Sequence, residues 1–321
     1  MDIFLKIGRR IVFASLCVLA FACGPRSGAP KAPQVRSFPS VEVPIVYTDP
    51  DERIAWMTSH FWDRYLDTTQ VFLTDSLTLN GVRAEAAEKE FGTFITLLEM
   101  APLSQGVAIM NRFFSQAEAF GHRDREVFSR LSEWVRKYLY DPNSPVRSED
   151  LYLPWIQRQA ASPLTDDAYR AGYGWDARMC ALNRIGTPAA DFVFIDTKGR
   201  RQTLYGIRAE YTLLIFGNPG CGACQELMTT MSADPQLSAL IDSGRLKVVD
   251  IYIDDEIDNW KAHKAEYPAQ WINGYDPDAR IRMELLYNVR GIPSLYLLDD
   301  EKTVLLKDAP QENLLSALSR L

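Results

Sequence analysis

The sequence has few residues of the types that build metal sites, and it has no excess of basic residues. Only three histidines and five cysteines occur in 321 residues. Lysine and arginine together number 35, against 42 aspartates and glutamates, so the formal charge is −7. Domains that bind nucleic acid usually carry a basic patch, and no basic cluster occurs in this sequence. We therefore expect neither nucleic acid as a partner nor a bound metal ion.

The apolar stretch near the N-terminus is too short for a transmembrane helix. Residues 11–22 are apolar and follow the basic residues Lys6, Arg9 and Arg10, whereas a membrane-spanning helix needs ~20 apolar residues. A basic segment followed by a short apolar one is typical of a signal peptide. We expect residues 1–22 to be a signal peptide that is removed on export.

The residues around position 22 fit two kinds of processing, and both cut before Cys23. Ala20-Phe21-Ala22 fits the Ala-x-Ala motif of an ordinary signal peptidase. A small residue directly before a cysteine also resembles the lipobox of bacterial lipoproteins, although Ala20 and Phe21 depart from its usual residues. We favour lipid attachment to Cys23, because it accounts for an otherwise unpaired exported thiol. The proline-rich residues 23–47 then form a lipid-anchored linker, extended at ~3.1 Å per residue, although a leader without a role fits the same composition.

Residues 48–182 carry the periodic pattern of amphipathic helices. Apolar side chains recur at spacings of three and four residues, which places them on one face of a helix. Breaks at Asn80-Gly81, Ala101-Pro102 and Phe120-Gly121 predict a bundle of antiparallel helices. The apolar faces are formed by Ile54, Met57, Phe61 and Tyr65, by Phe91, Phe94, Ile95 and Leu98, by Val107, Met110, Phe114 and Ala117, and by Val127, Leu131, Trp134 and Tyr138.

Two side chains in this half have reactive groups. We interpret His60 as a packing residue with one hydrogen bond, because it lies on an aromatic-rich helix. Cys180 is expected to be a buried thiol, as free cysteines commonly are. A role for Cys180 as a third redox thiol stays open.

Residues 183–321 alternate between strand-like and helix-like segments. This alternation predicts an α/β fold with a central sheet covered on both faces. We expect the acidic residues from Asp254 to Asp258 to be a solvated helix start rather than a metal site, and Trp260 and Trp271 to line the surface near the cysteines. Strands are expected at residues 211–216, 246–253, 294–298 and 303–306, and helices at 256–266, 278–286 and 311–321.

Two cysteines separated by two small residues lie between an apolar strand and a helix. Cys221, Gly222, Ala223 and Cys224 follow the apolar residues 211–216, and helix-forming residues come next. The first turn of a helix favours a thiolate over a thiol, so Cys221 is the predicted nucleophile. Cys224, one turn further in, is placed to resolve a mixed disulfide on Cys221.

Two other roles for the cysteine pair fit the sequence less well. A zinc site needs about four ligands, and Cys180 and the three histidines are not at metal-ligand spacing. A purely structural disulfide between Cys221 and Cys224 would close too short a loop to stabilise the fold much through chain entropy.

The cysteine pair and the segment Gly291-Ile292-Pro293 together resemble the thioredoxin superfamily, and more closely its exported TlpA-like branch. Residues 186–199 are similar to the first hairpin of that branch, so the resemblance spans residues 186–321. It implies that Pro293 is a cis-proline whose loop faces the cysteines and binds the backbone of the substrate polypeptide. Ile292, Gly222 and Ala223 are the implied substrate contacts, and Cys221, Cys224 and Pro293 the implied catalytic residues.

The sequence departs from the superfamily at several of its usual positions. Gly220 and Ala223 stand where Trp and Pro are usual, and Ile215 stands where thioredoxins bury an acid. Leu227 replaces a glutamate of TlpA-like proteins. Peroxiredoxins need Thr or Ser at the position of Asn218, which argues against a peroxidase.

The helical half resembles a domain of unknown function that precedes TlpA-like domains in Gram-negative, Bacteroides-type lipoproteins. We therefore expect a periplasm-facing, membrane-anchored lipoprotein with an all-α domain at residues 48–182 and a thioredoxin-like domain at residues 183–321. The expected activity is thiol–disulfide exchange with protein thiols and disulfides, with electrons exchanged with a membrane redox partner. No cofactor is expected beyond the redox-active disulfide Cys221–Cys224. The alternative is a non-catalytic binding or assembly lipoprotein that uses the thioredoxin fold as a scaffold.

Overall fold

The computed structural model of the protein describes residues 35–70 and 72–321. The predicted signal peptide, the predicted lipidation site Cys23 and residues 24–34 of the linker lie outside the described residues. Within the described ranges, no helix has both the length and the apolar character that a membrane span requires.

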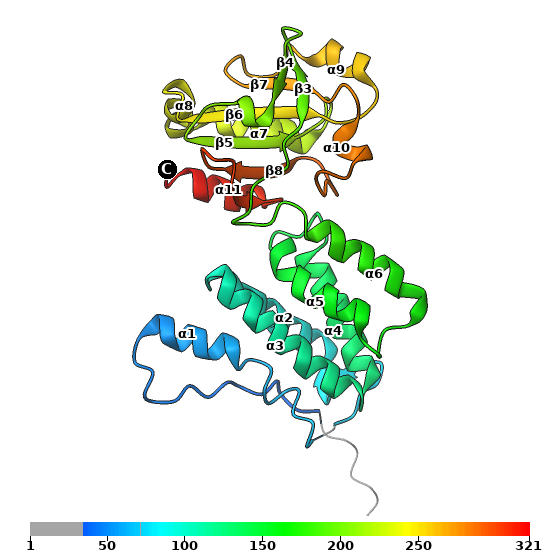
Figure 1. The fold of residues 1–321 in the computed structure, drawn as a ribbon. Coiled ribbons are helices and arrows are strands. Elements are labelled where there is room, and N and C mark those ends of the chain that lie inside the picture. The colour runs from blue at the N-terminus through cyan, green and yellow to red at the C-terminus, as the bar shows by residue number, and fades with distance from the viewer. Residues whose placement is uncertain (1–34, 71) are drawn as a thin grey trace, which may run out of the picture. The chain divides into compact units, whose positions relative to one another are not determined.

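The first half of the described chain is helical, as its periodicity predicts (Figure 1). Helix α3 packs against both α4 and α5, and α5 packs against α6. The break at Asn80-Gly81 is the turn of a short β-hairpin, in which both residues have positive φ angles, 49° and 78°. The elements of this half are α1 (Pro50–Ser59), β1 (Thr78–Leu79), β2 (Val82–Arg83), α2 (Ala84–Glu99), α3 (Leu103–Gly121), α4 (Arg125–Leu139), α5 (Glu149–Ala161) and α6 (Asp167–Cys180).

Aromatic side chains fill the core of the helical half. Trp62 stacks on Phe113 with ring centroids 4.7 Å apart, and Phe113 in turn packs on Trp155 at 4.9 Å. The predicted apolar face of α2 is buried throughout, at Phe91, Phe94, Ile95 and Leu98. His60 is a packing residue as interpreted, because its ring stacks on Trp56 and its Nδ1 contacts Asp63.

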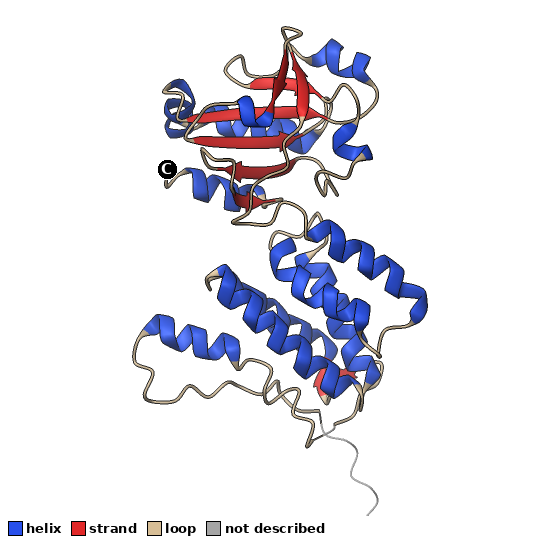
Figure 2. Cartoon of the chain, viewed as in Figure 1, coloured by secondary structure: helices blue, strands red, loops and turns tan. Residues whose placement is uncertain are grey.

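The second half forms a mixed seven-stranded sheet flanked by helices (Figure 2). The strand order is β4-β3-β7-β6-β5-β8-β9, in which β5, β6 and β7 run parallel and the other neighbours antiparallel. The elements are β3 (Val193–Asp196), β4 (Arg201–Thr203), η1 (Leu204–Gly206), β5 (Tyr211–Phe216), α7 (Gly222–Ala233), α8 (Pro235–Asp242), β6 (Leu246–Tyr252), α9 (Ile257–His263), β7 (Ile272–Tyr275), α10 (Arg280–Met283), β8 (Ser294–Leu298), β9 (Val304–Lys307) and α11 (Gln311–Leu318).

Alternate residues of the central strand β5 pack into two different cores. Leu213 and Ile215 join a cluster with side chains of α7, α8 and α11, whereas Leu214 and Phe216 join a cluster on the opposite face. The period of two along a strand produces this division. The predicted order of a helical domain followed by an α/β domain is confirmed, and the β1–β2 hairpin is an element that the all-α prediction did not include.

The start of β9 pairs on its outer side with the chain that enters the sheet domain. Gly186 and Ala189 donate backbone hydrogen bonds to the carbonyls of Val304 and Lys302, at 2.8 and 2.9 Å, and the amide of Val304 donates to Thr187 at 2.9 Å. The opposite edge strand, β4, has three residues.

One expectation about the sheet half is wrong. Trp260 and Trp271 do not line a surface near the cysteines, because both are buried, with 2% and 8% of their area exposed. Trp260 donates from Nε1 to Asn273 at 2.8 Å and packs on Tyr275, while Trp271 belongs to the core beneath α7 and α8.

Candidate functional site

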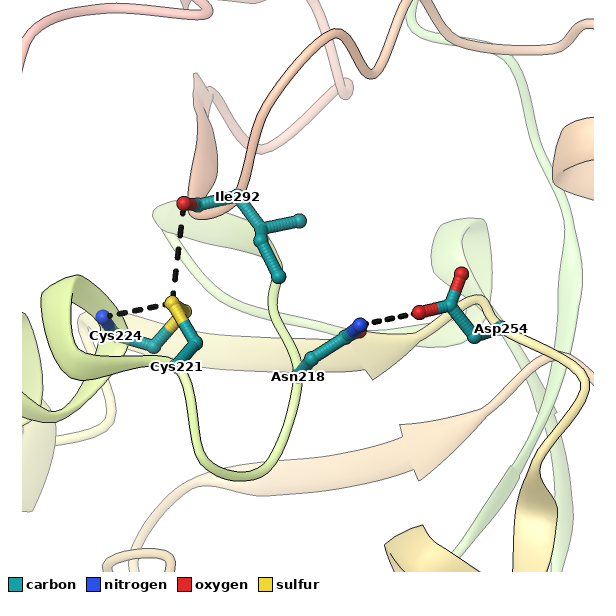
Figure 3. The surroundings of a disulfide bond; sticks show 5 residues. All are labelled: Asn218, Cys221, Cys224, Asp254 and Ile292. Atoms are coloured by element: carbon teal, nitrogen blue, oxygen red, sulfur yellow. Dashed lines mark hydrogen bonds between the residues drawn. A yellow bond between two sulfur atoms is a disulfide. The ribbon is translucent and has the colours of Figure 1, made fainter. Parts of the chain in front are cut away.

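The cysteine pair lies at the start of α7, shortly after the end of β5, as the sequence predicts. β5 ends at Phe216, a loop follows in which Gly220 has a φ of 77°, and Cys221 is the N-cap residue of α7. Cys221 is half-buried and Cys224 is buried, and the two sulfurs form a disulfide (Figure 3). The sulfur nearer the surface is therefore that of Cys221, which we predicted to be the nucleophile.

Two backbone groups lie against the sulfur of Cys221. The amide of Cys224 donates to it at 3.2 Å, and the carbonyl oxygen of Ile292 lies 3.8 Å away (Figure 3). The Ile292–Pro293 peptide bond is cis, and its loop faces the cysteine pair, as the resemblance implied. The amide donor and the positive end of α7 both favour a thiolate at this position.

The three residues expected to contact substrate surround this sulfur. Gly222 and Ala223 are exposed in the first turn of α7, and Ile292 has 37% of its area exposed. All three lie next to Cys221, either along the chain or across the contact with Ile292. The three residues thus form accessible surface beside Cys221.

Three polar side chains, Asn218, Asp254 and Arg282, contact one another beside the cysteine loop. Asn218 donates from Nδ2 to Asp254 (Figure 3). Arg282 donates from Nη1 to the other carboxylate oxygen of Asp254 at 3.0 Å. Among the described residues, no group of three or more His, Cys, Asp or Glu is placed to hold a metal ion. The first acid of the Asp254–Asp258 loop thus binds an amide and a guanidinium.

A groove of about 400 Å³ begins beside these side chains. Asn218 and Ile292 lie on its wall next to the cysteines, and Leu285 and Val289 add apolar surface. Met179 of α6 also lines it, so both halves of the described chain contribute. The groove therefore lies beside the cysteine loop and the Ile292–Pro293 loop.

The sequence analysis missed one buried acid in this site, Asp250 on β6. It is 2% exposed and is the register partner of Ile215, the position at which thioredoxins bury an acid. A Cβ at Gly217 would lie 3.3 Å from Asp250 Oδ2 and 3.6 Å from Cys224 Sγ, so the carboxyl and the inner sulfur lie on the same side of this glycine. The acid therefore comes from the neighbouring strand.

Burial sets the protonation of this carboxyl. It raises the pKa of Asp250 to about 7, because an ionised carboxylate is poorly solvated in an apolar interior. The nearest polar contact is a long one, from Asn273 Nδ2 to Asp250 Oδ1 at 3.4 Å. A carboxyl that titrates near neutrality can exchange protons with a thiol.

Cys180 is fully buried at the end of α6, as expected. Burial, followed by the nearby Glu149, raises the pKa of its thiol far above the ordinary value. Because a redox thiol must be accessible and ionisable, this environment gives Cys180 the character of a core residue.

The fold has clear relatives among solved structures. A thioredoxin-like protein from Bacteroides caccae is 32% identical, with a TM-score of 0.75 over 89% of this chain and 99% of that chain. The C-terminal domain of an uncharacterized protein from Bacteroides fragilis is 44% identical over 43% of this chain and 98% of that one, with a TM-score of 0.41. A domain of a "possible thiol-disulfide isomerase" from Cytophaga hutchinsonii is 26% identical over 44% and 94%, with a TM-score of 0.36.

The helical half matches a described domain family. Residues 24–174 match the profile of a domain of unknown function (DUF5106). No curated protein matches the sequence significantly. The chain belongs to the family of thioredoxin-like proteins, of the Bacteroides type in which this helical domain precedes the thioredoxin-like domain.

Proposed function

We propose that the protein is a thiol–disulfide oxidoreductase that acts on protein disulfides. The observation that carries the proposal is the position of Cys221, which caps α7 with its sulfur against the Ile292 carbonyl. An accessible sulfur at a helix N-terminus, with a second cysteine one turn behind it, suits exchange better than scaffold stapling.

The proposed reaction has two exchange steps. The thiolate of Cys221 attacks a client disulfide, so that a Cys221–client bond forms and the first client sulfur leaves as a thiolate. Cys224, as a thiolate, then attacks Cys221 and releases the second client sulfur. The client gains two electrons and two protons, and the protein is left with the Cys221–Cys224 disulfide, which a dithiol donor must reduce again.

We assign Asp250 the role of accepting the proton that Cys224 loses in the second step. Cys224 must lose its proton before it can attack, and its sulfur is closed off from solvent. Asp250 lies on the same side of Gly217 as this sulfur and titrates near neutrality. A carboxylate with that pKa is a suitable general base at physiological pH.

The client is proposed to bind along the groove beside the cysteines. The backbone next to its disulfide contacts the Ile292–Pro293 loop, and neighbouring side chains meet Gly222 and Ala223. The apolar walls at Leu285 and Val289 favour segments of a polypeptide over a small hydrophilic disulfide.

We further propose that the protein works at the periplasmic side of a membrane, held there by lipid on Cys23, and that a membrane redox partner supplies or removes its electrons. Mass spectrometry of the mature N-terminus tests the lipid. A Cys23→Ser variant should leave the membrane fraction, and an unchanged fractionation would contradict the anchor.

The activity is tested by following the reduction of insulin with dithiothreitol as the electron donor. Cys221→Ser should abolish catalysis, and Cys224→Ser should accumulate a mixed disulfide with the client. Redox titration with thiol trapping gives the midpoint potential: reductants resemble thioredoxin at about −270 mV, and strong oxidants lie near −120 mV. A Cys221→Ser variant as active as the wild type would refute the mechanism. A bond that resists reduction below about −300 mV would instead support a structural disulfide and a binding protein.

A further inference from the structure

The helical domain places a buried carboxylate against the loop that carries the cis-proline. Glu149 is the first residue of α5, where an acid usually faces solvent and interacts with the helix dipole. Its side chain is instead fully buried, with an exposed fraction of 0%. Among the described residues, the three side chains within hydrogen-bond or ion-pair distance of it all belong to the thioredoxin-like domain.

Three donors converge on this carboxylate. Asn288 donates from Nδ2 to Oε1 at 2.5 Å, Arg290 donates from Nε to the same oxygen at 2.9 Å, and Lys307 Nζ lies 2.8 Å from Oε2. Burial raises the pKa of Glu149, and Lys307 and Arg290 oppose that rise. A buried charge is retained only where such partners surround it.

Arg290 connects Glu149 to residues on both sides of the Ile292–Pro293 bond. Its Nη2 donates to Asp308 at 2.8 Å, and Asp308 accepts a hydrogen bond of 2.9 Å from Ser294, the residue after Pro293. Its guanidinium also lies 4.2 Å from the ring centroid of Tyr140 in the helical domain. The loop is therefore bound to one ionic network before and after the cis bond.

A close backbone contact fixes the same loop. A Cβ at Gly291 would lie 3.2 Å from Cβ of Pro142, so the glycine lets the loop rest directly on the helical domain. Gly291 immediately precedes Ile292, whose carbonyl faces Cys221 at 3.8 Å. The helical domain thus contacts the loop at the residue next to the one that faces the sulfur.

We propose that Glu149 is a positioning residue for the redox site: through Arg290 it holds the Ile292–Pro293 loop where the backbone of a disulfide-bearing polypeptide docks beside Cys221. The proposal rests on the proposed function and gives the helical domain a part in it. Glu149 touches neither client nor sulfur, so it acts on the capture of a polypeptide and not on the reactivity of the thiolate.

The chain offers a matched control in the next residue. Asp150 is also buried in the first turn of α5, but it binds Arg184 at 3.3 Å and the amide of Ile185 at 3.4 Å, in the connection between the domains. Glu149→Gln and Asp150→Asn each replace a buried carboxylate by an amide of the same shape. Only the first removes a charge that binds the cis-proline loop.

The experiment compares these variants with the wild type in the mature chain. For Glu149→Gln we expect kcat/KM for a disulfide-bonded peptide to fall by about tenfold to a hundredfold, mainly through KM, because small misplacements of a binding group have effects of that size. Alkylation of reduced Cys221 by iodoacetamide, which needs no docking loop, should stay within about twofold of the wild-type rate. Asp150→Asn should keep its kcat/KM within about threefold.

Hydrogen exchange tests, independently of activity, whether Glu149 holds the cis-proline loop in place. Peptides that cover residues 288–295 should exchange at least about tenfold faster in Glu149→Gln than in the wild type or Asp150→Asn, since opening of the loop exposes its amides. If the wild type reduces no disulfide, the proposed function fails, and the exchange result alone tests the positioning. Equal exchange in all three proteins, or an unchanged kcat/KM in Glu149→Gln, would overturn the inference.

Arg290→Lys serves as a second variant in case Glu149→Gln does not fold. It keeps the positive charge but removes the planar fork that reaches Glu149 and Asp308 together. The same rise in KM and the same local exchange are expected. A variant with wild-type values in both measurements would contradict the role of Arg290 as the connecting side chain.

Discussion

Replacing Asp250 by asparagine should make the oxidised protein more stable at neutral pH. Asp250→Asn keeps the shape of the side chain and still accepts from Asn273, but it removes a group whose ionisation is suppressed by burial. The native pKa is about 7, against an ordinary value of 3.8. Since one pKa unit corresponds to 1.36 kcal/mol, the difference amounts to about 4 kcal/mol.

The sign follows from which state holds the proton. Below about pH 4, Asp250 is protonated in both the native and the unfolded protein, and it adds no pH dependence. Between about pH 4 and pH 7 the unfolded chain ionises while the native protein keeps the proton, so the free energy of unfolding falls by ~1.4 kcal/mol per pH unit. Above about pH 7 both states are ionised and the loss is complete.

The assay is denaturant unfolding of the oxidised protein between pH 4 and pH 8. Cys221 and Cys224 do not titrate in this form, so they add nothing to the comparison. The free energy of unfolding of Asp250→Asn minus that of the wild type should grow by about 4 kcal/mol across this range. A difference that stays constant within ~1 kcal/mol would refute the account of Asp250.

The same variant should be a poorer catalyst. Without a proton acceptor behind Cys224, release of the client from Cys221 should slow by about a hundredfold, within the usual range for general base catalysis. Quenched-flow trapping should show the mixed disulfide accumulating. Release at the wild-type rate would assign the proton of Cys224 to another group.

Three further predictions concern packing. Phe113→Ala should lower the free energy of unfolding by ~3–5 kcal/mol, because Phe113 packs between Trp62 and Trp155; a loss under ~1 kcal/mol in denaturant unfolding would contradict that core. Gly217→Ala should cost ~1–3 kcal/mol, since its Cβ would crowd the Asp250 carboxyl at 3.3 Å; unchanged stability would show that the carboxyl can move. Cys180 should resist iodoacetamide in the native protein and react after unfolding, as mass spectrometry of the labelled chain can show; rapid native labelling would make it an accessible thiol.

The local parts of the fold could be predicted from the sequence. Phe91, Phe94, Ile95 and Leu98 recur at helical spacing, and all four are buried in α2. The apolar run before Cys221 is the buried strand β5. In both cases the pattern lies within one element, so neighbouring residues alone contain the information.

Elements with a weak local pattern escaped prediction. β7 consists of Ile272, Asn273, Gly274 and Tyr275, and asparagine and glycine are both depleted in strands. Its backbone is held by β3 and β6 on either side, which supply the pairing that its sequence does not favour. Trp260 and Trp271 were misplaced because an aromatic side chain gives no indication of which face of a fold it enters.

The deeper parts of the site depend on contacts between distant residues. Asp250 takes its place beside Cys224 only because β6 pairs with β5 in one register. Glu149 lies at a helix start, where an acid is ordinarily explained by the helix dipole. Its partner Arg290 is 141 residues away along the chain, so no local sequence pattern indicates that the two side chains pair.

The pairing of residues 186–189 with β9 bears on how the protein meets unfolded chains. An open sheet edge presents a row of free amides and carbonyls that an extended segment of another chain can join. Here the connecting segment already occupies one edge at Lys302–Val304, and the other edge strand, β4, has three residues and carries the exposed Arg201. Both features reduce the length of free strand that an extended polypeptide could join at the borders of the sheet.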